Sequence, residues 1–480
     1  MEASYDLVVI GGGTGGLVAA LIAAGIGARV ALVERDRLGG DCLWTGCVPS
    51  KSLLAAAELA HLIRHADGLG LTPSEPAIDF SRVMERVRRA VTTIEAHESA
   101  ERLQRDGVSL IRGHARFTGR GRLVVDARPL RFRAAIIATG SRPVVPSVPG
   151  LTDAPTLTTD TVWQLERLPE RLVILGGGPI GCEFAQAFVR LGAAVTVVEL
   201  SQRLLPREEP AASRLLADRL TAEGVQIRLD AQAERFESAS GHSEVVLAGG
   251  ERLPADAILL AVGRVPRSTG LGLETVGVAT DPRGAVLVDE HLRTSARGIY
   301  AVGDVTGLLQ FTHVAAHHAR VAVPNALFHA GSRRSETIPW VTFTDPEVAR
   351  VGLTEAEARE RWGDRARVAG YEYAELDRAI TSGQAYGFAK LIADPRGRLV
   401  GATIAAPAAG EALGEVAALI ARGGRMHDLS RAVHAYPTLA EGPVRAADDD
   451  LAARYSTPGL RRLASLVFGG QRLWSRLRGR

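Results

Sequence analysis

Two cysteines five positions apart, Cys42 and Cys47, are the residues of this sequence best suited to carry chemistry. They lie in the segment LGGDCLWTGCVPSK, residues 38–51, just before a run of helix-forming residues. Two neighbouring thiols can cycle between dithiol and disulfide and so exchange two electrons. In a regular helix, residues five apart are too distant for a disulfide. Because Pro49 is favoured in a first helical turn, we expect the helix to begin near Pro49 and the preceding loop to join the sulfurs.

Other roles for these residues are weaker. No C-x-x-C pattern occurs and no histidine lies nearby, so we expect no metal centre. The third cysteine, Cys182, is predicted to be a small buried residue on a helix. Lysine occurs only at Lys51 and Lys390, while arginine is used nearly everywhere else, which indicates that these two positions need more than a positive charge.

An internal repeat predicts the elements that position the cysteines. Residues 6–34 and 171–199 each read as an apolar strand, a G-x-G-x-x-G loop, an apolar helix and a second strand ending in Glu. This context indicates dinucleotide binding, because the glycines admit a pyrophosphate to a helix N-terminus and the carboxylate accepts hydrogen bonds from a ribose. The predicted binding residues are Gly11, Gly13, Gly16 and Glu34 in the first copy, and Gly176, Gly178, Gly181 and Glu199 in the second.

The repeat extends into return strands that end at Thr139-Gly140 and at Gly263, and a later strand ends at Gly303-Asp304. We therefore predict an α/β fold with two Rossmann-like dinucleotide-binding domains, one nucleotide held permanently and one exchanged, followed by an α+β domain. The predicted boundaries are 1–150 and 270–335 for the two parts of the first domain, 151–269 for the second, 336–450 for the third, and 451–480 for an Arg-rich tail.

Composition agrees with a globular chain of about three domains. The 480 residues are 46% hydrophobic with a formal charge of +3, and the basic residues are dispersed, so nucleic acid is not an expected partner. Three cysteines are too few for a disulfide-stapled secreted fold, and the N-terminus lacks a basic signal-peptide region. We expect a cytoplasmic protein.

Residues 38–51, together with the repeat, resemble the active-site signature of the class I pyridine nucleotide–disulfide oxidoreductases, which include dihydrolipoamide dehydrogenase, glutathione reductase and mercuric reductase. The resemblance runs from Tyr5 to about Asp450. It implies a Cys47 thiolate of low pKa against a flavin, and a Cys42 thiol that meets the acceptor. It also implies that Lys51 lies near the flavin and pairs with Glu183.

The resemblance further assigns a cofactor to each dinucleotide domain. The residues expected at FAD are Gly11, Gly13, Gly16, Glu34, Lys51, Thr139, Gly140, Gly303 and Asp304. Those expected at NAD(P)H are Gly176, Gly178, Gly181, Glu199 and Gly263. We predict NADH, because a carboxylate such as Glu199 repels a 2′-phosphate, although Arg203 is close enough in sequence to permit NADPH.

The chain departs from the family where a His-Pro-Thr motif normally supplies a general base and a following Glu orients it. Here the stretch reads HAYPTLAE, with Tyr436 in the place of the base and Glu441 in the place of the orienting residue. His434 lies two residues earlier, out of the register set by Pro437. A phenol is a poor base at neutral pH, so efficient disulfide turnover is not expected. Mercuric reductases carry Tyr here, but they also carry a C-terminal cysteine pair, and this chain has no cysteine after Cys182.

We therefore predict an NAD(P)H oxidoreductase that resembles mercuric reductase and passes electrons through FAD and the cysteine pair to a metal ion, a quinone or an electrophile. The alternatives are a dihydrolipoamide dehydrogenase, a diaphorase with incidental cysteines, and an FAD- and NAD-binding redox sensor with little turnover. The resemblance implies a homodimer in which Tyr436 faces the partner's Cys42. The tail, residues 458–480, alternates apolar residues with Arg at near-helical spacing, interrupted at Gly469-Gly470. This pattern is compatible with weak contact to an anionic membrane surface, with packing on the dimer and with disorder.

Overall fold

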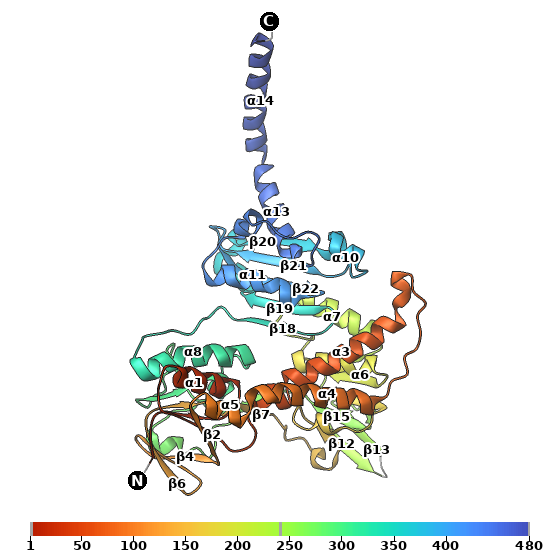
Figure 1. The fold of residues 1–480 in the computed structure, drawn as a ribbon. Helices are drawn as coiled ribbons and strands as arrows, with labels where there is room; N and C mark the ends of the chain where they lie inside the picture. The colour runs from red at the N-terminus through yellow and green to blue at the C-terminus, as the bar shows by residue number, and fades with distance from the viewer. Residues whose placement is uncertain (1–2, 240–241, 479–480) are drawn as a thin grey trace. The chain divides into compact units, whose positions relative to one another are not determined.

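The computed structural model of the chain describes residues 3–239 and 242–478 and divides into two compact units (Figure 1). The units are Met1–Pro206 with Ala217–Glu336, and Arg207–Leu216 with Thr337–Arg480. The segment Arg207–Leu216, which the sequence analysis assigns to the 151–269 domain, thus groups with the second unit. The division of the first unit into an FAD part and an NAD(P) part stays a prediction.

The first unit contains a seven-stranded sheet in the order β3-β2-β1-β6-β5-β4, with β17 paired to β6. Strands β3, β2, β1, β6 and β17 run parallel, and β4, β5 and β6 form an antiparallel meander. The central strands are buried on both faces, which explains their continuous β-branched and apolar sequences. The strands are β1 (Ala3–Ile10), β2 (Val30–Glu34), β3 (Val108–Arg112), β4 (Ala115–Gly119), β5 (Arg122–Val125), β6 (Arg128–Ile137) and β17 (Ile299–Ala301).

A second, fully parallel sheet has the order β11-β10-β9-β15-β8. Its strands are β8 (Thr156–Leu157), β9 (Arg171–Leu175), β10 (Ala194–Val198), β11 (Gln226–Arg228) and β15 (Ala257–Leu260). The smaller sheets of this unit are antiparallel: β12 (Ala233–Ala239), β13 (His242–Leu247) and β14 (Arg252–Ala255), and the pair β7 (Ser141–Pro143) with β16 (Arg264–Pro266). Both parallel sheets have the βαβ core that the repeat predicts.

Helices connect these strands. The helices of the first unit are α1 (Thr14–Gly25), α2 (Gly40–Trp44), α3 (Cys47–Arg64), α4 (Phe80–Glu95), α5 (Ala100–Arg105), α6 (Pro179–Arg190) and α8 (Thr312–Phe328), and α7 (Pro210–Ala222) belongs partly to each unit. Helices α1 and α8 pack against each other, and α3 packs against both α4 and α6 (Figure 1). Single 3₁₀ turns link several elements, and η6 (Gly303–Thr306) is the one that bears on the site.

The second unit is built on an antiparallel sheet in the order β18-β19-β22-β21-β20. Its strands are β18 (Pro339–Thr342), β19 (Glu347–Gly352), β20 (Arg367–Glu372), β21 (Phe388–Ala393) and β22 (Leu399–Ala406). Its helices are α9 (Glu355–Trp362), α10 (Asp377–Thr381), α11 (Ala409–Ala421), α12 (Met426–Arg431), α13 (Glu441–Tyr455) and α14 (Pro458–Arg478). Helices α11 and α13 pack on the sheet and bury its apolar face. This is the α+β arrangement that the sequence predicts.

The C-terminal region differs from the sequence prediction in two ways. Helix α13 continues to Tyr455, past the predicted boundary at residue 450, so the break before the tail lies at 456–457. Helix α14 then runs without interruption through Gly469-Gly470, where we expected a break. Two glycines cost a helix only about 2 kcal/mol in propensity, and the strong helix formers on either side offset that cost.

Candidate active site

The two G-x-G-x-x-G loops have almost the same backbone geometry. Gly11 and Gly176 adopt φ values of 106° and 107°, and Gly13 and Gly178 are extended N-cap residues of α1 and α6, with ψ values of −177° and −176°. Neither cap residue offers a side chain to the free backbone N–H groups of the first helical turn. Each loop therefore presents backbone N–H groups that no cap side chain engages, together with the positive end of a helix dipole, which suits an anionic group.

Within each loop, the third glycine and the middle glycine are needed for different reasons. A Cβ on the third glycine would lie 1.8 Å from the Gly11 carbonyl oxygen in the first loop, and 1.9 Å from the Gly176 oxygen in the second. The protein's own packing therefore requires Gly16 and Gly181. A Cβ on Gly13 would meet only Gly40 Cα, at 3.7 Å, and one on Gly178 would meet nothing within 4 Å. The space beside these middle glycines fits the close approach of a dinucleotide pyrophosphate.

The carboxylates at the ends of β2 and β10 also occupy equivalent positions. Glu34 Oε2 accepts from Gly12 N at 2.5 Å, and Glu199 Oε2 accepts from Gly177 N at 2.6 Å. Their second oxygens accept from backbone N–H groups two residues further along the chain. Each carboxylate is thus held beside the glycine loop, where it could also accept a ribose hydroxyl.

Cys42 and Cys47 lie on two successive helices. Cys42 belongs to the short helix α2, and Cys47 is the first residue of α3, with Thr45 and Gly46 between the helices. The predicted start near Pro49 is therefore wrong by two residues. The missing N–H of Pro49 falls within the first turn, where backbone donors have no helical partner, so the helix can begin earlier. The break between the helices still exists and allows the two thiols to meet.

Both cysteines are free thiols, and their electrostatic environments differ. A hydrogen bond from Cys42, together with Thr312 and the ammonium of Lys51, lowers the pKa of Cys47 to about 6 despite partial desolvation. The same hydrogen bond and burial raise the pKa of Cys42 far above its ordinary value. At neutral pH the pair therefore holds one thiolate, on Cys47, and one proton, on Cys42. Cys182 is fully buried, as expected, and its thiol donates to the Gly177 carbonyl at 3.3 Å.

Thr312, the first residue of α8, contacts the thiolate. Its Oγ1 lies 3.3 Å from Cys47 Sγ, although 265 positions separate the two residues. The hydroxyl can donate to the sulfur, and the N-terminus of α8 adds a favourable dipole for a negative charge. Sequence reasoning missed Thr312 because nothing in the local sequence links it to the cysteines.

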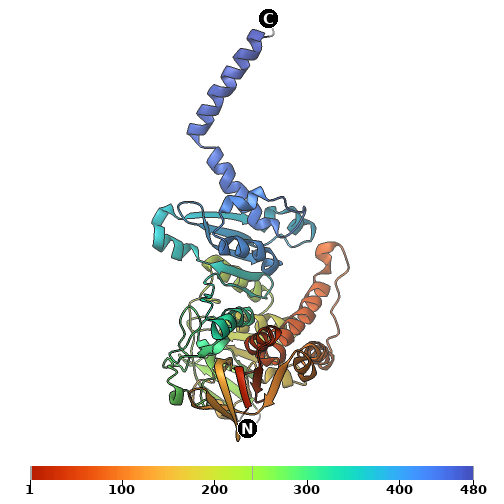
Figure 2. The same cartoon turned by 60° about the vertical axis from the view of Figure 1, so that its left-hand side comes forward.

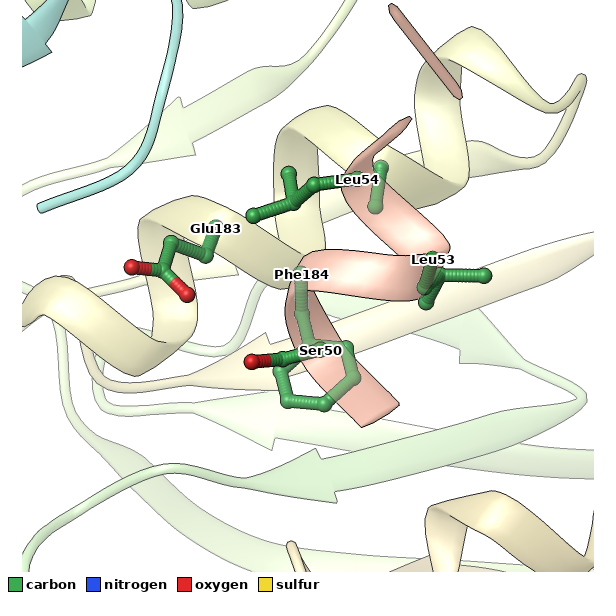
Figure 3. A pocket seen from close by; sticks show the side chains of 6 residues that line it. Ser50, Leu53, Leu54, Glu183 and Phe184 are labelled. Atoms are coloured by element: carbon green, nitrogen blue, oxygen red, sulfur yellow. The ribbon is translucent and has the colours of Figure 1, made fainter. Parts of the chain in front are cut away.

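Lys51 and Glu183 form an ion pair across the packing of α3 on α6. Lys51 Nζ lies 2.6 Å from Glu183 Oε2, with side chains that are 35% and 9% exposed. Helix α3 buries Pro49, Leu53, Ala57 and Ala60 on one face, which fixes the side from which Lys51 projects. Figure 3 shows the junction, where a small pocket is lined by Ser50, Leu53 and Leu54 of α3 and by Glu183, Phe184 and Ala187 of α6.

Arg264 links the cysteine segment to the predicted FAD residues. Its guanidinium pairs with Asp41, next to Cys42, and its Nε donates to Ser141 Oγ at 2.7 Å. Ser141 in turn donates to Asp304 Oδ2 at 2.7 Å. Burial raises the pKa of Asp41, and the neighbouring Arg264 opposes that shift. Sequence reasoning missed this network, although Arg264 directly follows Gly263.

The remaining predicted positions adjoin this network. Thr139 Oγ1 donates to the Arg267 carbonyl at 2.6 Å, which connects the end of β6 to the segment after β16. Gly140 and Gly263 both have positive φ, and Gly303 begins the 3₁₀ turn that carries Asp304. His318 of α8 accepts from Gly303 N at 3.2 Å. The predicted FAD residues that end or follow β1, β2, β6 and β17 thus lie at the same edge of one sheet, while Lys51 lies on α3.

In the second unit, Tyr436 is 66% exposed and its hydroxyl donates to Asp377 Oδ2 at 2.8 Å. This hydrogen bond raises the pKa of Tyr436 above its ordinary value. Glu441, expected as the orienting residue, instead accepts from Thr438 N at 3.0 Å and from Arg445. The phenol therefore contacts α10 rather than the start of α13, and the orienting role of Glu441 stays a prediction.

His434 is engaged elsewhere in the second unit. Its Nε2 lies 2.9 Å from Glu415 Oε2, and its Nδ1 lies 3.1 Å from the Ala432 carbonyl oxygen. These contacts hold the imidazole against α11. The structure therefore assigns it no contact with Tyr436 among the described residues.

The fold and this site define a flavoprotein oxidoreductase with a dithiol centre. The family described as "Pyridine nucleotide-disulphide oxidoreductase" matches residues 5–319, and its dimerisation domain matches residues 338–447. The chain belongs to this family, whose class I members are FAD-dependent enzymes that also use a pyridine nucleotide.

The similar proteins include enzymes with different acceptors. The chain is 35% identical over 456 residues to dihydrolipoyl dehydrogenase of Chlamydia muridarum, covering 92% of this chain and 96% of the relative. It is 38% identical over 451 residues to mercuric reductase of Streptomyces lividans, covering 91% and 94%. A solved structure, the Cu(II) complex of the HOCl-induced flavoprotein disulfide reductase RclA from Escherichia coli, is similar with a TM-score of 0.84 and 31% identity, covering 93% of this chain and 99% of that one.

Proposed function

We propose that this protein is an NADH-dependent flavoprotein reductase that delivers electrons through Cys42 and Cys47 to a metal ion, a quinone or an electrophile. The observation that carries the proposal is Tyr436, whose phenol donates to Asp377 at the position where disulfide-reducing members of the family carry a histidine base. Because this hydrogen bond raises the pKa of Tyr436, even less phenolate is present at neutral pH than for free tyrosine, so Tyr436 is poorly suited to act as a general base. A metal ion, which accepts electrons without proton transfer, suits this site better than a disulfide substrate.

The residues of the first unit fit FAD and NADH at the two glycine loops, with Gly13 and Gly178 beside the pyrophosphates. FAD, when bound, would relay an electron pair from NADH to the sulfur pair. The protein's own part is to hold Cys47 as a thiolate, through the Cys42 thiol, Thr312 and Lys51. Glu183 fixes the Lys51 ammonium.

The second half-reaction balances with the protonation states described above. The Cys42 thiol and the Cys47 thiolate would give two electrons to two Cu(II) ions, forming one S–S bond, two Cu(I) ions and one free proton. The Cu(II) complex of the similar reductase supports a soft or redox-active metal ion as one candidate acceptor. The mercuric reductases among the relatives support the same class.

The carboxylate of Glu199, which follows β10, supports NADH rather than NADPH as the substrate. The Glu199 carboxylate is held at the second glycine loop, where it would repel a 2′-phosphate. Arg203, the nearby cation, donates to the Pro206 carbonyl at 2.7 Å and is thus directed to the backbone. A comparison of kcat/KM for NADH and NADPH tests this choice, and equal values would contradict it.

We further propose a homodimer, supported by the match to the family's dimerisation domain. In that dimer Tyr436 would face the partner subunit's cysteine pair. Sedimentation velocity tests the assembly, and a monomer at micromolar concentration would contradict it.

The deciding experiment is an acceptor screen in which NADH oxidation is followed with purified flavin-loaded protein. We expect turnover with Cu(II), Hg(II) or a quinone and little with lipoamide. Tyr436→His should raise lipoamide turnover by about 10²-fold, the usual size of a general-base effect, while Tyr436→Phe should not. Rapid lipoamide turnover by the unaltered protein would contradict the proposal.

Two further outcomes of the screen distinguish the alternatives. If Cys42→Ser leaves all acceptor reduction unchanged, the electrons leave directly from the flavin and the protein is a diaphorase. If no acceptor supports turnover, the reading as an FAD- and NAD-binding sensor replaces the proposed enzyme. A purified protein that is colourless and takes up no flavin would refute all of these readings.

A further inference from the structure

Helix α14, Pro458–Arg478, is a long helix with an exposed apolar surface. Figures 1 and 2 both show it extending away from the sheet of its own unit. Its exposed apolar side chains are Leu460 (45%), Leu463 (60%), Leu466 (74%), Val467 (50%), Phe468 (56%) and Trp474 (60%). A protein in water rarely leaves so many large apolar groups exposed on one helix, so this surface indicates a binding partner.

Most of the apolar residues of α14 occupy a different face from its basic residues, and Phe468 is the exception, because it lies beside Arg461. At about 100° per residue, five of the apolar residues fall within an arc of about 120°. Three arginines fall within a separate arc of about 100° on the opposite side. The apolar face comprises Leu460, Leu463, Leu466, Val467 and Trp474, and the basic face comprises Arg461, Arg462 and Arg472.

The charge of this segment has one sign. Residues 458–480 contain six arginines and no Asp or Glu. Guanidinium groups form bidentate hydrogen bonds with phosphates, and a basic, amphipathic helix with Trp on its apolar face is typical of an interfacial helix. Among the described residues no helix is long and apolar enough to cross a bilayer. The helix also lies beyond residue 447, where the match to the dimerisation domain ends.

We propose that α14 binds in the plane of a membrane surface rich in anionic phospholipid. The apolar face enters the acyl boundary, and the arginines bind lipid phosphates. A second copy of α14 is a less suitable partner for the apolar face of α14. The apolar seam is broken at Gly470-Gln471, and a helix without acidic residues offers a second copy only like charges.

The test is flotation of the full-length, flavin-loaded protein with vesicles of phosphatidylcholine, alone or mixed with phosphatidylglycerol. We expect binding only to the mixed vesicles, weakened by added salt. Each basic residue near an anionic surface strengthens partitioning roughly fivefold, so a triple variant (R461Q, R462Q, R472Q) should bind roughly a hundredfold more weakly. The variant with lysine at the same three positions should retain most binding, because it keeps the charge.

Two controls separate this surface from the catalytic function. Arg283→Gln, at an arginine that is 80% exposed in the first unit, should leave flotation unchanged. The apolar variant L463S/L466S should lose binding, and all variants should keep the solution rate of NADH oxidation. Equal binding to neutral and anionic vesicles would overturn the proposal, as would full binding by a chain that ends at Thr457. If removal of α14 instead reduces the assembly size in solution and the triple glutamine variant floats normally, the partner is a second copy and the proposal is wrong.

Discussion

We predict that the hydrogen bond from the Thr312 hydroxyl accounts for part of the lowering of the Cys47 pKa. Valine has nearly the same shape as threonine but cannot donate to the sulfur, so Thr312→Val removes the hydrogen bond at 3.3 Å with little change in packing. A hydrogen bond to a charged group contributes about 1.5–3 kcal/mol, and one pKa unit corresponds to about 1.4 kcal/mol. Because Cys47 is exposed, we take the low end of that range.

The expected result is an increase of about one unit in the pKa of Cys47, from about 6 toward about 7. At a pH midway between these values, the thiolate fraction would fall from roughly three quarters to roughly one quarter. The lost hydrogen bond raises the pKa because it stabilises only the thiolate.

The assay is a pH titration of the two-electron-reduced, flavin-loaded protein. A thiolate beside oxidised flavin absorbs at long wavelength, and the loss of this absorbance on acidification gives the pKa. Thr312→Ser is the matched control, since it keeps the hydroxyl and should titrate like the unaltered protein. If the valine variant titrates like the unaltered protein, or the serine variant shifts as much as the valine variant, the hydroxyl does not stabilise the thiolate.

Three further predictions concern the nucleotide site and stability. Gly178→Ala should raise KM for NADH at least tenfold without changing the free energy of unfolding, because its Cβ meets no protein atom within 4 Å. Gly181→Ala should instead unfold the domain, because its Cβ would lie 1.9 Å from the Gly176 oxygen. Urea titration combined with NADH kinetics distinguishes the two effects. Glu223→Ala should cost about 3–5 kcal/mol, because it leaves the buried guanidinium of Arg190 without its carboxylate; a loss below about 1 kcal/mol in urea would contradict a buried ion pair. The depressed pKa of Cys47 means that the unfolded chain binds more protons than the folded chain between about pH 6 and the ordinary thiol pKa of 9.0. The reduced protein should therefore become more stable as pH rises through this window, and Cys47→Ser should remove the increase.

The fold class and the dithiol motif could be predicted because their signals are local. The offsets within each glycine loop, and the same 23 residues from first glycine to Glu in both copies, depend only on the geometry of a strand, a turn and a helix. The agreement of the φ values at Gly11 and Gly176 to within 1° shows how fully those short-range requirements determine the backbone. The exact start of α3 and the continuity of α14 were predicted wrongly, because helix ends and weak helix formers depend on differences of about 1 kcal/mol.

What tertiary structure alone decided is which distant groups contact the reactive atoms. Thr312 reaches Cys47 across 265 positions, and Asp377 reaches Tyr436 across 59. Such contacts arise where separate elements pack, and no short-range pattern encodes them. The sequence by itself determined that the chain carries two nucleotide-binding folds and a pair of thiols. The contacts of Cys47 with Cys42, with Thr312 of α8 and with Lys51 decided that this sulfur is a thiolate at neutral pH, and the packing of α10 decided that the Tyr436 phenol donates to Asp377.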